Sequence, residues 1–123
     1  MKKLKFLGLF LALSLIFAHV THAQFLRGTT VTRVAGGAAG NASVSLCSIS
    51  ICLVPVNYPA PGSHTFAMAP NDVVNFVIGF GTGGFFVNKS AVDATAGFYV
   101  QGNGTNTLLI QKTGLGVYEF FII

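Results

Sequence analysis

The chain contains two cysteines, Cys47 and Cys52, which frame the hexapeptide CSISIC. If this stretch is an extended strand, five steps of about 3.3 Å place the two residues roughly 16 Å apart. A disulfide requires Cα atoms within about 7 Å of each other, so an internal bond demands that the chain fold back between the cysteines. The intervening Ser-Ile-Ser-Ile contains no Gly, Pro or Asn to favour such a reversal.

The sequence leaves three arrangements of the thiols open. Cys47 and Cys52 form an internal disulfide across a tight loop, bond to cysteines of neighbouring subunits, or remain free as small hydrophobic side chains. Aliphatic side chains occupy even positions before Cys47 and odd positions after Ser48. This change of phase predicts a β-bulge or a strand break, with both cysteines on the face opposite the aliphatic residues.

Side chains suited to acid–base or nucleophilic catalysis are scarce. His64 is the one histidine beyond residue 23, and a Ser-His-Asp site would have to combine it with Asp72 or Asp93. No G-x-S-x-G motif is present, and a two-carboxylate glycosidase would have only these aspartates and Glu119 to use. No spacing of ligands indicates zinc. The sequence therefore predicts no catalytic, cofactor-binding or metal site, and a protein that is not an enzyme.

A glycine-rich stretch, GFGTGG, matches the G-x-G-x-x-G pattern of dinucleotide-binding folds through Gly79, Gly81 and Gly84. That fold needs a helix directly after the glycines, because the helix N-terminus holds the pyrophosphate. The following FFVNKS has β-strand character instead. We therefore expect a glycine turn and no bound nucleotide.

The N-terminus reads as a secretory signal peptide. Lys2, Lys3 and Lys5 precede a short apolar run over residues 6–18, and small residues lead to a cleavage site after Ala23. The run is shorter than the roughly 20 residues that span a bilayer. We expect a secreted protein (extracellular, on the cell surface or periplasmic) that does not span a membrane once the signal is removed.

Removing the signal also changes the charge of the chain. The basic residues left are Arg27, Arg33, Lys89 and Lys112, which against three carboxylates give a net charge of +1. Four scattered cations do not form the basic face that nucleic-acid binding requires. So few charges favour a surface that is partly covered by another copy, although a low-charge monomer remains open.

Short β-like runs recur about every ten residues and predict an all-β fold. We expect a single antiparallel β-sandwich or jelly roll of about seven to nine short strands. The main runs are 29–35, 42–54, 64–68, 73–80, 85–87, 98–101, 107–111 and 117–123. The last run is apolar on both faces except at Glu119, which predicts a central strand or one buried against another chain. Residues 102–106 predict a hairpin loop.

The chain divides into three predicted parts: the signal peptide (1–23), an N-terminal strand with a flexible Gly/Ala-rich connection (24–41), and the β-sandwich domain (42–123). The segment 24–35 either donates a strand to an open sheet edge of the next subunit or is an ordinary first strand of its own domain. Ser90 and Asp93 have the spacing of a capping box, and Gly97 could end one or two helical turns.

Glycan binding remains an open expectation. Three tyrosines could stack on sugars, and the Asn-rich loop 102–106 could bind hydroxyl groups; the tyrosines are Tyr58, Tyr99 and Tyr118. Three Asn-X-Ser/Thr sequons would be glycosylated only in a host with that machinery, at Asn41, Asn88 and Asn103.

The sequence is most consistent with an exported structural or assembly protein. We expect a self-associating β-sandwich subunit of an extracellular filament or surface layer, and hence a homo-oligomer or polymer without a cofactor. The alternative is a monomeric extracellular binding module for glycans or surfaces.

Overall fold

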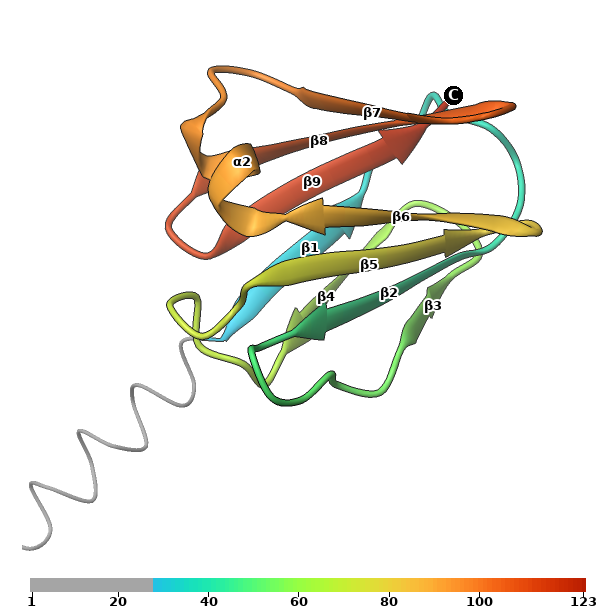
Figure 1. Cartoon of the computed structure of the whole chain (residues 1–123). Helices are drawn as coiled ribbons and strands as arrows, with labels where there is room; N and C mark the ends of the chain where they lie inside the picture. The colour runs from blue at the N-terminus through green and yellow to red at the C-terminus, as the bar shows by residue number, and fades with distance from the viewer. Residues whose placement is uncertain (1–27) are drawn as a thin grey trace, which may run out of the picture.

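The computed structural model describes residues 28–123, which form two β-sheets packed against each other (Figure 1). The five-stranded sheet has the order β4-β1-β9-β8-β7 and the four-stranded sheet the order β3-β2-β5-β6. The strands are β1 (Thr29–Arg33), β2 (Ala42–Cys47), β3 (Val56–Tyr58), β4 (Gly62–Phe66), β5 (Asn75–Phe80), β6 (Gly83–Asn88), β7 (Tyr99–Asn103), β8 (Asn106–Gly114) and β9 (Val117–Ile122). The all-β class is confirmed, whereas the predicted signal peptide lies outside the described residues.

Alternating burial along the strands builds one core between the sheets. In β9, Tyr118, Phe120 and Ile122 are fully buried, whereas Glu119 and Phe121 between them stay partly accessible. The same period of two recurs in β1 and β5, and the buried side chains of both sheets join in one cluster. Each large apolar side chain buried in this way contributes about 1.5–3 kcal/mol.

The C-terminal strand β9 is central, as its apolar composition predicts, because it lies between β1 and β8. It pairs with β8 antiparallel and with β1 parallel. The parallel pair is the one departure from the expected antiparallel arrangement among the strand pairs of residues 28–123.

Strand β1 belongs to its own molecule in this structure. It pairs with β4 on one side and β9 on the other, so it is an ordinary first strand and not a strand left free for a neighbour. Of the two alternatives for segment 24–35, the structure contains the ordinary first strand, and residues 24–27 of that segment lie outside the described residues.

The Gly/Ala-rich connection that follows β1 is held by a buried charge. Arg33 is only 6% exposed, and its guanidinium donates hydrogen bonds to the carbonyl oxygens of Gly40 (2.6 Å), Ala38 (2.9 Å) and Tyr58. The ring of Phe80 lies 5.8 Å from the guanidinium carbon. This connection, predicted to be flexible, is therefore anchored to β3 and β5 by one side chain.

Two hairpins follow the turn chemistry of the sequence. Within GFGTGG, Gly81 and Thr82 form the β5–β6 turn, and Gly81 has a φ of +60° that favours glycine; the other glycines lie in the two strands. The β7–β8 hairpin is also formed, but its loop is shorter than the five residues expected. Asn103 pairs with Asn106, which leaves Gly104 (φ +57°) and Thr105 as a two-residue turn.

The short helix α2 (Lys89–Ala94) joins the two sheets, and its start differs from the prediction. Asn88 is the N-cap, and its Oδ1 accepts a hydrogen bond from the Ser90 amide at 3.0 Å. Ser90 therefore lies inside the helix rather than at its cap. Asp93 does not close a capping box because the position three residues after the Asn88 cap is Ala91. The helix ends at Ala94, before Gly97.

Candidate functional site

The two cysteines form an internal disulfide, with Cα atoms 4.0 Å apart. The expected long strand over residues 42–54 does not exist: β2 ends at Cys47, the chain reverses over residues 48–51, and Cys47 and Cys52 oppose each other in an antiparallel bridge. The Leu53 amide then donates to the Leu46 carbonyl at 2.9 Å, which continues the small hairpin. Of the arrangements left open, the structure contains the bond within one chain.

Ser48 supplies the turn chemistry that the sequence interpretation missed. Its amide donates to the Ile51 carbonyl at 2.7 Å, and its hydroxyl accepts from the amides of Ser50 (3.3 Å) and Ile51 (3.1 Å). A serine side chain can replace a backbone partner in a turn in this way, so glycine or proline is not needed. The change of aliphatic phase at Ser48 was the available signal, and it marks the reversal.

The reversal turns apolar side chains outward. Ile49 is 94% exposed and Ile51 57% exposed, although both would have faced a core in a continuous strand. Next to them lies a groove of about 690 Å³ between residues 48–53 and 67–74. Its lining includes Leu53, Met68 and the exposed carboxylate of Asp72. This apolar groove is a candidate binding site.

The sheet edges form a second candidate surface. Strand β3 has only three residues and is flanked by Pro55 and Pro59. The β6 and β7 edges bind each other through side-chain amides: Gln101 donates to the Phe86 carbonyl (3.2 Å) and Asn103 to the Gly84 carbonyl (2.6 Å). Proline, short length and cross-sheet bonds are all means of protecting an edge from another chain.

Strand β4 follows Pro61, but its five residues contain no proline and are not bonded to the edge of the other sheet. It pairs with β1 alone, and Gly62 to Thr65 are exposed. The amide of Thr30 binds the Gly116 carbonyl on the β9 side, so Val31 faces β4 and forms a hydrogen-bonded pair with His64. The backbone groups of Ser63 and Thr65 therefore point to the free edge, because backbone direction alternates along a strand.

The outer face of the five-stranded sheet carries an apolar row. Val100 of β7 opposes Leu109 of β8, which opposes Phe121 of β9, and Phe98 packs edge-on against Phe121 at 5.4 Å between ring centroids. Val100 is 58% exposed. We call these four residues the outer apolar row.

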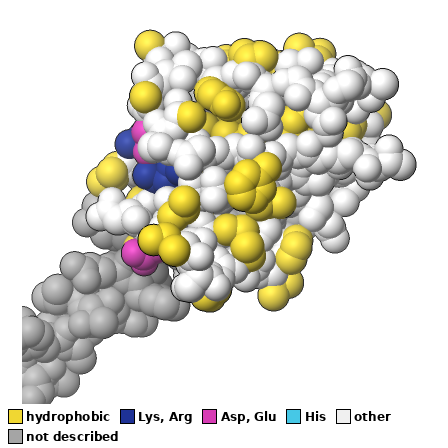
Figure 2. Space-filling view, in the orientation of Figure 1, with side chains coloured by type: hydrophobic (Ala, Val, Ile, Leu, Met, Phe, Trp, Pro, Cys, Tyr) yellow, Lys and Arg dark blue, Asp and Glu magenta, His cyan; other side chains and the backbone are white. Residues whose placement is uncertain are grey.

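Figure 2 shows hydrophobic side chains scattered over one face of the molecule, with charged side chains only along one side of it.

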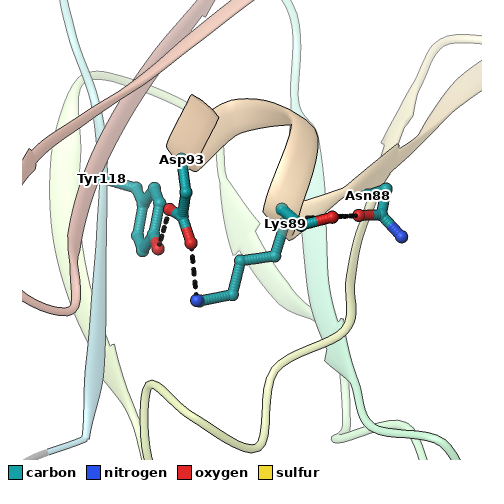
Figure 3. Close-up of polar contacts among 5 residues, drawn as sticks. Asn88, Lys89, Asp93 and Tyr118 are labelled. Carbon is teal, nitrogen blue, oxygen red and sulfur yellow. Dashed lines mark hydrogen bonds and ion pairs between the residues drawn. The ribbon is translucent and has the colours of Figure 1, made fainter. Parts of the chain in front are cut away.

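The most connected ionisable group is Asp93 (Figure 3). Its carboxylate accepts hydrogen bonds from Lys89 Nζ and from the Tyr118 hydroxyl, both at 2.7 Å. Burial raises the pKa of Asp93, whereas the hydrogen bonds from Lys89 and Tyr118 lower it. The lowering effects together exceed the effect of burial, so the pKa of Asp93 lies below its ordinary value. Burial, helped by the Asp93 carboxylate, raises the pKa of Tyr118.

This arrangement is a structural anchor of α2 on β9. Asp93 stays ionised and Tyr118 stays neutral near pH 7, and both are already engaged with each other. Neither group is therefore prepared to exchange a proton with a substrate. In residues 28–123 no three His, Cys, Asp or Glu side chains cluster as metal ligands would.

The other residues considered for catalysis are dispersed. His64 lies on the exposed edge strand β4 and packs against Phe66 at 4.8 Å between ring centroids. Asp72 lies in the turn beside the groove, and Glu119 accepts a hydrogen bond from Gln111 on the outer sheet face. The structure does not bring these groups together.

Two of the three tyrosines considered for sugar stacking are core residues. Tyr58 and Tyr118 are 4% and 0% exposed, so their ring faces are not available to a ligand, whereas Tyr99 is half-buried. The Tyr58 hydroxyl donates to the Val31 carbonyl at 2.8 Å, and burial raises the pKa of Tyr58 to about 12. Tyr99 is thus the remaining candidate of the three.

The asparagines of the three sequons have structural contacts. Asn41 donates to the Asn57 side chain at 3.1 Å, Asn88 caps α2, and Asn103 bonds across to β6. These contacts explain the asparagines at the three positions without reference to a glycan.

Comparison of the chain with protein-family models, with curated proteins and with solved structures found no match. In the part of the chain that the structure describes, no helix has the length and apolar character needed to cross a membrane.

Proposed function

We propose that this protein is an exported, self-associating β-sandwich subunit whose copies join through the free edge of β4. The observation that carries the proposal is the contrast between edges: β3, β6 and β7 are protected, whereas Ser63 and Thr65 present unpaired backbone groups. An exposed strand edge without charge or proline is a template for another strand.

The rest of the molecule supports this function. Beyond residue 23 the chain has only seven formally charged side chains, so little electrostatic repulsion opposes contact between copies. The internal disulfide suits an oxidising compartment, in agreement with the expected export.

Two β4 strands related by a two-fold axis would pair antiparallel and join two five-stranded sheets into one. Such an isologous contact closes after two copies, so a filament or layer needs a second interface. The outer apolar row (Phe98, Val100, Leu109 and Phe121) is our candidate for that second contact, because it lies on the outer sheet face of a molecule of low charge, with Val100 exposed and the other three side chains half-buried.

The substitution Thr65→Pro tests the first contact. It removes an amide hydrogen from the free edge and leaves the amides that bind β1 in place, so we expect it to weaken association at least tenfold. Thr65→Ala is the matched control, because it also loses the side-chain bond to Thr30 but keeps the amide. Analytical ultracentrifugation of the exported, processed protein measures the association constant for each variant.

A monomeric wild-type protein at all accessible concentrations would contradict the proposal and favour the alternative, an extracellular binding module. An unchanged association constant in Thr65→Pro would show that the β4 edge is not the contact. Equal weakening by Thr65→Pro and Thr65→Ala would contradict pairing through the Thr65 amide, because only the proline variant loses the amide hydrogen.

A further inference from the structure

The groove beside the disulfide loop leaves apolar side chains exposed at one end of the molecule. Ile49 and Ile51 stand on a loop that the disulfide and Ser48 hold in place, and Met68 and Val74 line the groove beside them. A volume of about 690 Å³ is in the range of pockets that hold a small ligand or a few side chains. Burial of these residues would be favourable for whatever covers them.

The first described residues enter the fold at the wall of this groove. Gly28 packs so tightly that a Cβ there would lie 2.1 Å from the Phe66 carbonyl oxygen. The hydroxyl of Thr29 donates to the carbonyl of Met68 at 2.9 Å, and Met68 is one of the groove residues. The preceding residues 24–27 therefore begin next to the groove, and four residues reach up to about 13 Å.

The chemistry of these four residues, Gln-Phe-Leu-Arg, complements the groove. Phe25 and Leu26 supply two large apolar side chains for the apolar lining. Arg27 supplies a cation, and Asp72 at the groove is a carboxylate outside the one ion pair found in residues 28–123, which joins Lys89 and Asp93. The segment thus offers two apolar side chains to the apolar lining and one cation to the carboxylate of Asp72.

We propose that residues 24–27 of the same chain dock in this groove, with Phe25 and Leu26 against Ile49, Ile51 and Met68 and with Arg27 near Asp72. The short covalent connection favours the chain's own segment over that of another copy, because it holds the segment at a high effective concentration. This contact is independent of association through β4. It would cover the apolar end of the molecule and shield the disulfide loop from solvent.

The absence of tryptophan from the chain makes a direct test possible. Phe25→Trp introduces a single fluorophore into the full chain, exported and processed. We expect blue-shifted emission and protection from acrylamide quenching, both independent of protein concentration. Ile51→Asp in the same background should return the emission to that of an exposed tryptophan, because it places a carboxylate in the apolar lining. Gln24→Trp is the matched control one position earlier.

Emission typical of exposed tryptophan in Phe25→Trp would overturn the proposal. A blue shift that disappears on dilution would also overturn it, since the occupant would then be a second copy. A blue shift unaffected by Ile51→Asp would place the segment elsewhere. Because Thr65→Pro does not touch the groove, the same fluorescence in that variant separates this contact from the β4 contact.

Discussion

The two ends of strand β2 are held by opposite means. At its start, the connection from β1 is fastened by the buried Arg33 guanidinium, which donates to three carbonyl oxygens. At its end, the chain reverses over residues 48–51 and is closed by the disulfide. At the first end, hydrogen bonds hold the loop against the buried Arg33 side chain. At the second end, Ile49 and Ile51 are exposed on a loop that the disulfide closes.

The two ends differ in whether the loop that they hold has to be buried. A buried charge is costly unless its donors are satisfied, so the Arg33 end depends on every partner being present. A disulfide acts mainly by restricting the unfolded chain and makes no demand that its loop be buried. The disulfide end is therefore free to present apolar side chains at the surface.

The largest expected effect is at the Arg33 end. Arg33→Met keeps an unbranched side chain but leaves the carbonyls of Ala38, Gly40 and Tyr58 without their donor. We expect a loss of about 3–5 kcal/mol in the free energy of unfolding, measured by urea denaturation. Arg33→Lys is the control and should lose less, because it retains one charged donor. A loss below about 1 kcal/mol in Arg33→Met would contradict the anchoring role.

The next effect is the response to alkaline pH, through Tyr58 at the same end. Its folded pKa is raised to about 12, so its contribution to stability is complete below pH 10 and is lost as pH rises toward 12. In that window the slope approaches about 1.4 kcal/mol per pH unit for each such tyrosine, and the raised pKa of Tyr118 adds in the same direction. Urea denaturation between pH 9 and pH 12 measures this slope, because the range extends from below the ordinary tyrosine pKa of about 10 to the folded pKa of Tyr58.

Tyr58→Phe should make the alkaline decline shallower while lowering stability at neutral pH, because the bond to the Val31 carbonyl is lost. An unchanged slope in this variant would contradict the assignment of the decline to Tyr58.

The smallest effect is expected at the disulfide end. Cys47→Ala combined with Cys52→Ala should cost about 2 kcal/mol, the entropic value for a loop this short. The fold should persist, since the core lies elsewhere and Ser48 still supports the turn. Urea denaturation with and without reductant measures the cost. Reductant should lower the stability of the wild-type protein to that of the variant, and a loss larger than that at Arg33 would reverse the comparison.

Much of the fold could be predicted from local patterns. The C-terminal run, apolar on both faces except at Glu119, predicted a central strand, and the Gly-Asn-Gly-Thr-Asn stretch predicted the β7–β8 hairpin. The candidate surfaces were harder to predict. The reversal at Ser48 depends on a side chain replacing a backbone partner, and the sequence reading expected glycine or proline there. The N-cap was misplaced for a related reason, since Asn88 and Ser90 are both capable caps and only the backbone geometry selects one.

The sequence by itself determined the all-β class and the approximate position of most strands, because a period of two is a local property of the chain. It did not predict β3 and it continued β2 beyond Cys47. It also determined that charges are few and that the cysteines lie close in sequence. Only the tertiary structure decided which strands are neighbours, that β1 runs parallel to β9, and that the β4 edge is left open. Alternation specifies a face but not a partner, since pairing depends on contacts between residues far apart in the chain.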